Sequence, residues 1–269
     1  MNIARYLTLL CALALSLASA AAAEPTYAKA YAASTDLREF VDGRAHSPAE
    51  GSFFYAYWAR WECMDDGGIA RRVAKETPPL PGSAQETATR KELERCRNMP
   101  TNITSGAMQR DDVEVGRKAG DKLFADFNGR NGSWFYVDDQ ATLQRALRLM
   151  SVDNDPNMIW VVAQKLAGLG SYRIAIKGQR PSEADGRSVY VAFLLVACDL
   201  HADCGKSHRW MRVWCIQNAE CDETTIEGYW QRRDEGPRQM DWASIDKYRS
   251  LIGSAAKTGD WSSFLLLSE

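Results

Sequence analysis

Apolar residues recur at helical spacing along most of the chain, and strand-like alternation is rare. The clearest case follows Ser47-Pro48-Ala49-Glu50, where a serine N-cap, a proline at the first helical position and a nearby glutamate predict a helix start. The aromatic residues behind it fall on one broad helix face: Phe53, Phe54, Tyr57, Trp58 and Trp61. Such a face is either core or a platform for sugars. We expect core, with the helix ending at Cys63.

Similar patterns predict a series of short helices and very little strand. The predicted helices cover Asp36–Val41, Ala84–Arg97, Ala107–Asp126, Ser188–Cys198, Ser207–Gln217, Thr224–Arg232, Asp241–Lys257 and Asp260–Leu267. Asp138 or Asp139, and then Asp155, are N-cap candidates for two more helices that should form an antiparallel hairpin. Tyr172–Ile176 is the best strand candidate, and Glu24–Ala33 reads as a loosely held start.

These elements predict an all-α fold, an irregular array of packed short helices and helical hairpins. No exact repeat period is visible, although a regular solenoid stays an open alternative. We expect one domain over residues 24–269. The proline-rich segment at 77–83, which has three prolines in five residues, is either an extended loop or a weak domain boundary.

The first 23 residues have the layout of a secretory signal peptide. Arg5 precedes an apolar run over Leu7–Leu17, and a cluster of small residues follows, so that cleavage after Ala23 or Ala20 is expected. Cys11 belongs to this run. The alternative is an uncleaved N-terminal anchor. No later apolar run reaches the ~20 residues of a membrane-spanning helix, so we expect no integral membrane segment in the mature chain and a periplasmic or secreted location.

Six cysteines remain after the predicted cleavage: Cys63, Cys96, Cys198, Cys204, Cys215 and Cys221. An even number in an oxidising compartment predicts disulfides, and the spacing favours Cys63–Cys96 with two further bonds inside the later cluster. Within that cluster the motif C-x5-C occurs twice. Local pairing of each motif and a ladder between the two motifs both remain open, with local pairing slightly favoured because a ladder must bridge most of a helix.

A metal site competes with the disulfides in the later cluster. Cys198, His201, Cys204 and His208 have the spacing of zinc ligands, and thiolate with imidazole suits that ion. Exported thiols usually oxidise, and the second cysteine pair has no histidine beside it. We therefore expect no metal and no cofactor, with both histidines in loop or helix-cap positions.

Composition excludes some classes of protein and identifies no chemistry. The 269 residues include 33 Lys and Arg against 35 Asp and Glu, a net charge of −2 that does not suit a nucleic-acid binder. No nucleophile elbow, H-E-x-x-H or phosphate-binding loop occurs. Paired acids, Glu62 with Asp65 or Asp66 and Asp199 with Asp203, would be needed for a glycoside hydrolase, although so many acids form such pairs by chance.

Two stretches resemble a known family. These are Val196–Gly205, together with Cys215 and Cys221, and the C-terminal Gly259–Ser263. They are similar to an uncharacterised family of secreted, cysteine-bearing helical proteins from Gram-negative bacteria. The resemblance covers mainly residues 188–263 and implies a helical fold without an assigned activity, so it transfers no catalytic residue.

The sequence therefore favours an exported binding or structural protein with a protein or cell-envelope partner over an enzyme. The first alternative is a periplasmic hydrolase that cleaves peptidoglycan with a carboxylate pair. The second is a metal-binding protein that uses the cluster from Cys198 to His208. An exposed apolar or aromatic patch of several hundred Å² with no perturbed acid nearby would favour binding, and a cleft with two acids about 5–10 Å apart would favour hydrolysis.

Overall fold

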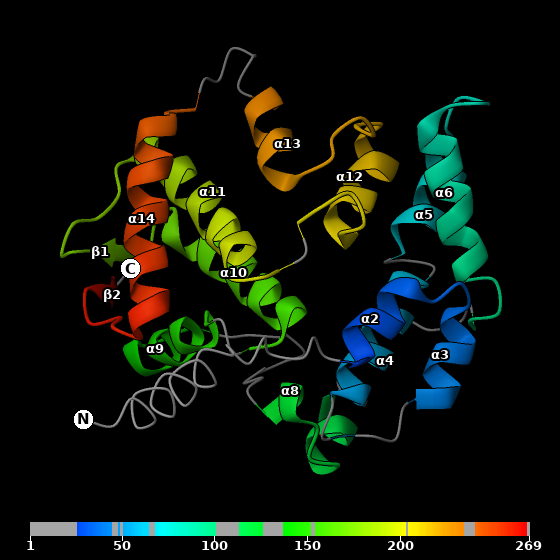
Figure 1. Ribbon diagram of the computed structural model, residues 1–269, viewed down its shortest axis with the longest axis horizontal. Coiled ribbons are helices and arrows are strands. Elements are labelled where there is room, and N and C mark those ends of the chain that lie inside the picture. The colour runs from blue at the N-terminus through cyan, green and yellow to red at the C-terminus, as the bar shows by residue number, and fades with distance from the viewer. Residues whose placement is uncertain are drawn as a thin grey trace, which may run out of the picture.

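Helices make up most of the computed structural model (Figure 1), which describes residues 26–44, 48, 51–64, 68–100, 113–125, 137–151, 154–202, 204–233 and 240–267. The predicted all-α class is confirmed. The helices are α2 (Thr26–Ala33), α3 (Leu37–Arg44), α4 (Ser52–Glu62), α5 (Ile69–Glu76), α6 (Ala84–Arg95), α8 (Lys122–Ala125), α9 (Gln140–Leu149), α10 (Pro156–Gly170), α11 (Glu183–Asp199), α12 (Arg209–Asn218), α13 (Ile226–Arg233) and α14 (Trp242–Thr258). Residues 113–118 are also helical.

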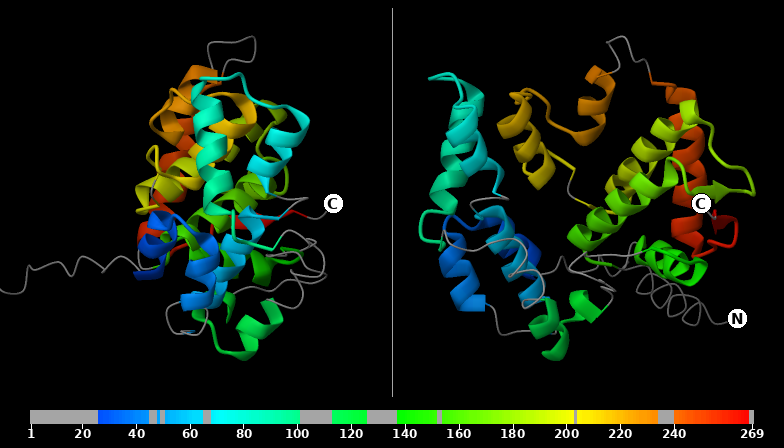
Figure 2. Two further views of the ribbon diagram at one scale, coloured as in Figure 1. Left: turned by 90° about the vertical axis from the view of Figure 1, so that its right-hand side faces the viewer. Right: turned by 180° about the vertical axis from the view of Figure 1, so that it is seen from behind.

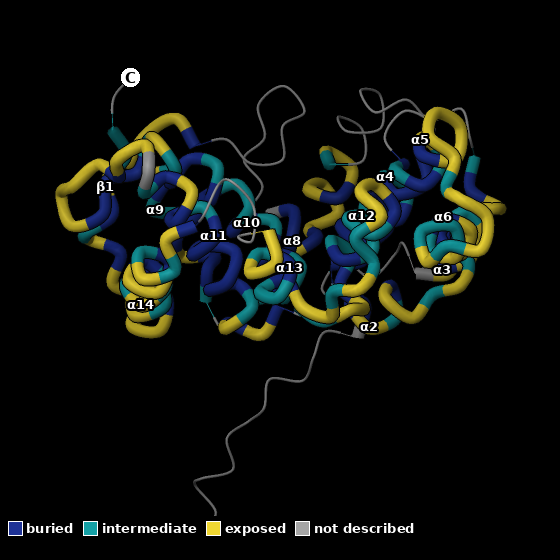
Figure 3. Tube along the Cα trace, turned by 90° about the horizontal axis from the view of Figure 1, so that it is seen from above, coloured by how far each residue is buried: buried dark blue, intermediate teal, exposed yellow. Residues whose placement is uncertain are grey.

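Three long helices form the best-packed part of the fold. The side chains from Val191 to Ala197 on α11 are buried almost completely because α10 covers one side of this helix and α14 another. Figure 2 shows α10 and α11 side by side from behind, and Figure 3 shows them largely buried while α14 exposes its outer face. An apolar run too short for a membrane thus becomes the buried central helix that the sequence predicted.

The other half of the array combines segments from opposite ends of the chain. The helices α2, α3 and α4 pack together, and α5 and α6 form a hairpin. The helix α12 lies against both α5 and α6, although more than 100 residues separate them in sequence. Ile216 of α12 is buried with Ala70 and Val73 of α5. This packing brings the first turn of α12 close to the ends of α4 and α6.

Two helices, α2 and α5, were not predicted from the sequence. The expected loose start at Glu24–Ala33 is corrected for its described part, Thr26–Ala33, because α2 buries Tyr27 and Tyr31, one turn apart, and the ring centroids of Tyr31 and Tyr55 lie 5.6 Å apart. The helix α5 was not predicted. Its buried positions, Ala70 and Val73, are too few to give a recognisable apolar period.

The aromatic helix begins later than predicted. Pro48 lies in a 3₁₀ turn, the predicted N-cap Ser47 lies outside the described residues, and α4 starts at Ser52. Its first N–H groups instead donate to a distant carboxylate, with Phe53 N 2.8 Å and Phe54 N 3.3 Å from Asp121 Oδ2. A cap supplied from 68 residues away leaves no local sequence signal.

The predicted role of the aromatic residues is confirmed as core. Phe54 and Tyr57 are completely buried, while Phe53, Trp58 and Trp61 are partly buried against the same core. The helix ends at Cys63, as predicted.

Near the C-terminus the predicted helix over Asp260–Leu267 is wrong. Residues Phe264–Leu266 form strand β2, which pairs antiparallel with β1 (Ile174–Ile176), so that Ile174 faces Leu266. The Gln140 side chain accepts a hydrogen bond from Leu266 N at 2.7 Å and donates to Phe264 O at 3.0 Å. The aromatic spacing that suggested a helix is overridden by backbone partners that lie far away in sequence.

The six cysteines form three disulfides: Cys63–Cys96, Cys198–Cys204 and Cys215–Cys221. Of the two alternatives for the later cluster, the structure has the local pairing. Each short bond ties the end of a helix, α11 or α12, to the turn that follows it. The long bond ties the end of α4 to the end of α6 and thereby closes the proline-rich loop and the α5–α6 hairpin into one covalent ring.

Candidate functional site

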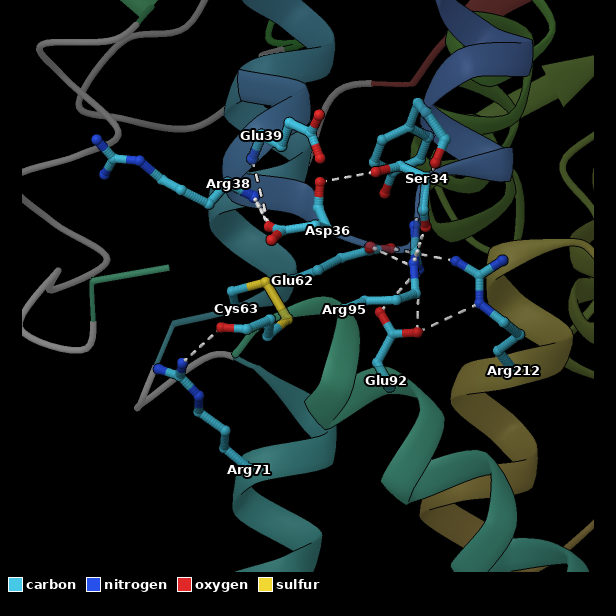
Figure 4. Close-up of a disulfide and its surroundings, with 12 residues drawn as sticks. Ser34, Asp36, Arg38, Glu39, Glu62, Cys63, Arg71, Glu92, Arg95 and Arg212 are labelled. Carbon is cyan, nitrogen blue, oxygen red and sulfur yellow. Dashed lines mark hydrogen bonds and ion pairs between the residues drawn. A yellow bond between two sulfur atoms is a disulfide. The ribbon is translucent and has the colours of Figure 1, made fainter. Parts of the chain in front are cut away.

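A cluster of buried charges lies where α4, α6 and α12 meet. We call it the ion-pair cluster; it consists of Glu62, Glu92, Arg95, Arg209 and Arg212. Glu62, Arg95 and Glu92 are its most deeply placed members, with side chains only 5%, 6% and 7% exposed. Figure 4 shows Glu92 between Arg95 and Arg212, beside the Cys63–Cys96 disulfide.

Local sequence explains how each member is placed. Glu62 ends α4 immediately before Cys63, and Arg95 ends α6 immediately before Cys96, so the disulfide holds these two side chains together. Glu92 lies one turn before Arg95 on the same face of α6. Arg209 and Arg212 are likewise one turn apart at the start of α12.

Two of the three arginines are well satisfied. Arg209 Nε lies 2.6 Å from Glu62 Oε1, and the guanidinium carbon lies 4.5 Å and 4.4 Å from the ring centroids of Trp58 and Trp61. Arg95 Nη1 donates to both Glu92 oxygens at 3.0 Å. Its other nitrogens donate to main-chain carbonyls, Nη2 to Tyr31 O in α2 at 3.2 Å and Nε to Ser34 O just after α2 at 2.9 Å.

Arg212 is the least satisfied of the three. Its closest carboxylate contacts are 3.6 Å from Nε to Glu92 Oε2 and 3.7 Å from Nη2 to Glu62 Oε1, both beyond hydrogen-bond distance. Nη1 donates to Ser207 O at 2.7 Å. The side chain is 22% exposed, against 6% for Arg95 and 11% for Arg209. Since guanidinium has five N–H donors, Arg212 retains donors for a ligand.

The two carboxylates of the cluster differ in acidity. Burial raises the pKa of Glu62, but Arg209, Arg212 and Arg95 together outweigh it and hold that pKa below its usual value. For Glu92, burial and the neighbouring charge of Glu62 prevail over the arginines and raise the pKa. The pair resembles an acid and a base, but the hollow between these side chains has a volume of only about 10 Å³, which leaves no room for a sugar substrate.

The carboxylate pairs predicted from sequence do not form a hydrolytic site in the described part of the chain. Glu62 is held by arginines, and Asp65 and Asp66 lie outside the described residues. Asp199 forms an ion pair with Arg249 of α14 at 2.7 Å, and its predicted partner Asp203 also lies outside the described residues.

Two open grooves flank the ion-pair cluster on either side of the end of α2. Groove A has a volume of about 620 Å³ and runs between the end of α2 and α6. Its charged lining is Arg90, Lys91, Glu94, Arg95 and Arg212. Groove B has a volume of about 440 Å³ and runs between α2, the start of α10 and the start of α12. Its charged or titratable lining is Lys29, Tyr31, His201, His208, Arg209 and Arg212.

Both histidines of the predicted cluster therefore lie in groove B, but not as metal ligands beside thiolates. The Cys198–Cys204 disulfide occupies the two sulfurs that the alternative zinc site requires. His208 is buried as the N-cap of α12, where Nδ1 accepts from Trp210 N at 3.3 Å, and His201 is exposed. Among the described residues, no group of three His, Cys, Asp or Glu side chains could hold a metal ion.

Sequence reasoning missed the three arginines of the cluster. The available signals were the i, i+3 pairs Glu92/Arg95 and Arg209/Arg212, which are common on exposed helix faces and do not by themselves indicate burial. Another basic pair, Arg232 and Arg233 at the end of α13, is exposed and forms ion pairs with Glu223 and Glu220.

Comparisons with protein-family models, with curated proteins and with solved structures found no match. No helix in the described ranges has the length and apolar character needed to cross a membrane.

Proposed function

We propose that this protein is an exported binding protein that takes an anionic ligand in groove A, next to Arg212. The observation that carries the proposal is the charge of the groove. Arg90, Lys91, Arg95 and Arg212 line it, and Glu94 is the single acidic residue among its lining side chains. Glu94 is itself engaged by Arg97 at 2.7 Å.

The cations of groove A differ in how far the protein already neutralises them. Arg90 and Lys91 are exposed on α6 and form no ion pair within the part of the chain that the structure describes. Arg212 makes only long contacts to Glu62 and Glu92. A positive groove on a chain of net charge −2 attracts anions, and arginine binds carboxylate or phosphate through paired N–H donors.

The same geometry favours binding over hydrolysis. A glycoside hydrolase needs two carboxyl groups on either side of its substrate, whereas Glu94 is the only carboxylate that lines groove A. Glu62 and Glu92, which contact the groove-lining Arg95 and Arg212, are themselves buried and held by arginines. Groove A presents cationic side chains and a small apolar surface. These groups can bind a ligand, but they do not supply the acid and base that hydrolysis needs.

The charge of groove A can be tested directly. In Arg90→Gln/Lys91→Gln, we expect the affinity for pyrophosphate and for citrate, measured by isothermal titration calorimetry at low salt, to fall at least about tenfold. The matched control is Arg148→Gln/Lys257→Gln, which removes the same two charges from exposed positions on α9 and α14 and should bind as the wild type does. Equal affinity in both variants, or no binding of either probe to the wild type, would contradict the proposal.

Export is supported by the leader-like first 23 residues and by the three disulfides. The described fold begins with α2 at Thr26, so cleavage after Ala23 or Ala20 would leave the first helix intact. We expect N-terminal sequencing of the exported protein to find a start within a few residues of Glu24. A chain that still begins at Met1 would show instead that the leader is retained as an anchor.

A further inference from the structure

Grooves A and B meet at the end of α2. Both are lined by Ala32, Ala33 and Arg212, so Arg212 belongs to the wall of each hollow. Groove A continues from there along Arg90 and Lys91 of α6. Groove B continues in the other direction toward Lys29 and His201.

Groove B has the same sign of charge as groove A. Lys29, Arg209 and Arg212 line it, and none of its lining residues is acidic. The helix α12 begins beside it at Arg209, which adds the positive end of a helix dipole to the side-chain charges. Ser207 and Asn157 add polar side chains. An anionic group is therefore favoured in both grooves, with Arg212 between them.

The floor that joins the grooves is apolar. The methyl groups of Ala28, Ala32 and Ala33 lie along α2, and Pro156 faces them from the start of α10. The buried carboxylates of Glu62 and Glu92 also neutralise part of the positive charge of the cluster's arginines. This arrangement suits a ligand whose charges are separated by uncharged, carbon-rich atoms, and suits less well a phosphate chain that is charged along its whole length.

We infer that the ligand is an acidic peptide segment that crosses the end of α2 and places one carboxylate in groove A and another in groove B. This inference rests on the proposed function, because it names the class of anion and adds a second contact region. The first carboxylate binds near Arg90, Lys91 and Arg212. The second binds near Lys29 and His201, and the residues between them cover the alanine floor.

A series of blocked peptides tests the inference on the full mature chain. The peptides are acetyl-Glu-amide and acetyl-Glu-(Ala)n-Glu-amide, with n from one to six, and the matching Gln peptides are the controls. We expect calorimetry to show one spacing that binds at least about tenfold more tightly than the single glutamate, because the second contact becomes intramolecular. The Gln peptides should not bind.

Two variants separate this inference from the proposed function. In Lys29→Gln/His201→Asn, the advantage of the two-carboxylate peptide should disappear while the single glutamate still binds; asparagine suits the left-handed backbone at residue 201, where φ is 73°. In Arg90→Gln/Lys91→Gln, both peptides should bind more weakly. Thermal melting of each variant checks that the fold is retained.

The outcome of these titrations decides separately on the inference and on the proposed function. If the single glutamate binds and no second carboxylate improves the affinity, the inference is wrong and the proposed function stands. If triphosphate binds more tightly than every peptide of the series, groove A still holds an anion, but the ligand is a phosphate chain. If neither peptide nor phosphate binds, both the inference and the proposed function fail.

Discussion

Replacing Glu62 by glutamine is expected to destabilise the fold by about 3–5 kcal/mol, the cost of removing one partner from a buried ion pair. The carboxylate is 5% exposed and is the closest acidic partner of Arg209, at 2.6 Å. It also lies 3.5 Å from Arg95 and 3.7 Å from Arg212. In Glu62→Gln the buried Arg95 and the partly buried Arg209 and Arg212 would keep only one carboxylate, Glu92, in the cluster. Urea unfolding with the disulfides intact would measure the loss without the ionic screening that guanidinium chloride adds.

The matched variant is Glu92→Gln, which should cost clearly less. Burial and the charge of Glu62 raise the pKa of Glu92, which means that the fold favours the neutral form of this side chain. Replacing Glu92 by the neutral glutamine should therefore lower the free energy of unfolding less than replacing Glu62. The two substitutions remove the same charge from neighbouring sites of similar burial. Equal losses in the two variants would mean that the difference in acidity between Glu62 and Glu92 has no energetic consequence.

The pH dependence of these variants follows from the directions of the pKa shifts. Glu62 has a lowered pKa in the folded state, so it stabilises the fold above its unfolded pKa of about 4.3, and the contribution is lost as the pH falls through the folded pKa. Glu92 has a raised pKa and acts in the opposite direction, favouring the fold below its unfolded pKa. The gap in unfolding free energy between wild type and Glu62→Gln should therefore narrow as the pH falls below about 4.

Loss of the Cys63–Cys96 disulfide is expected to be the second large effect. The bond closes a loop with a sequence separation of 33, and the chain-entropy model gives about 3.8 kcal/mol for a loop of this length. For Cys215–Cys221, with a separation of 6, the same model gives about 2.4 kcal/mol. The double variants Cys63→Ala/Cys96→Ala and Cys215→Ala/Cys221→Ala compare the two bonds directly.

The long disulfide should also affect ligand binding, because it holds Glu62 at the end of α4 against Arg95 at the end of α6. We expect its removal to lower the unfolding free energy more than removal of the short bond and to weaken anion binding in groove A as well. Denaturant unfolding and calorimetry on the same samples measure both effects. A larger loss from the short bond would show that native packing, and not the entropy of the unfolded chain, dominates the energetics of these cross-links.

Helices with local start signals were predictable from sequence. Asp139 and Asp155 cap α9 and α10 with their own side chains, and Asp241 caps α14 in the same manner. The apolar run of α11 and the aromatic face of α4 indicated burial because each has enough apolar residues to define a face. The short helix α5 and strand β2 escaped prediction, because each is fixed by partners that lie far away in the chain.

The candidate site also depends on partners that lie far away in the chain. Glu62 was considered as an acid beside Asp65 and Asp66, since neighbours in sequence are all that a sequence displays. In the folded chain its partners are Arg95, on α6, and Arg209 and Arg212, on α12. Nothing in a glutamate at a helix end indicates whether it faces water or three guanidinium groups.

The sequence by itself determined the helical class, the leader-like start and the local pairing preference of the cysteines, because spacing along the chain specifies amphipathic faces, caps and short loops. Only the tertiary structure decided which charges are buried together and where cationic surface is left open. Those features depend on α12 packing against α5 and α6, which brings Arg209 and Arg212 to a carboxylate 147 and 150 positions earlier in the chain. Electrostatic energy depends on distance and burial, and neither is fixed before the helices have packed.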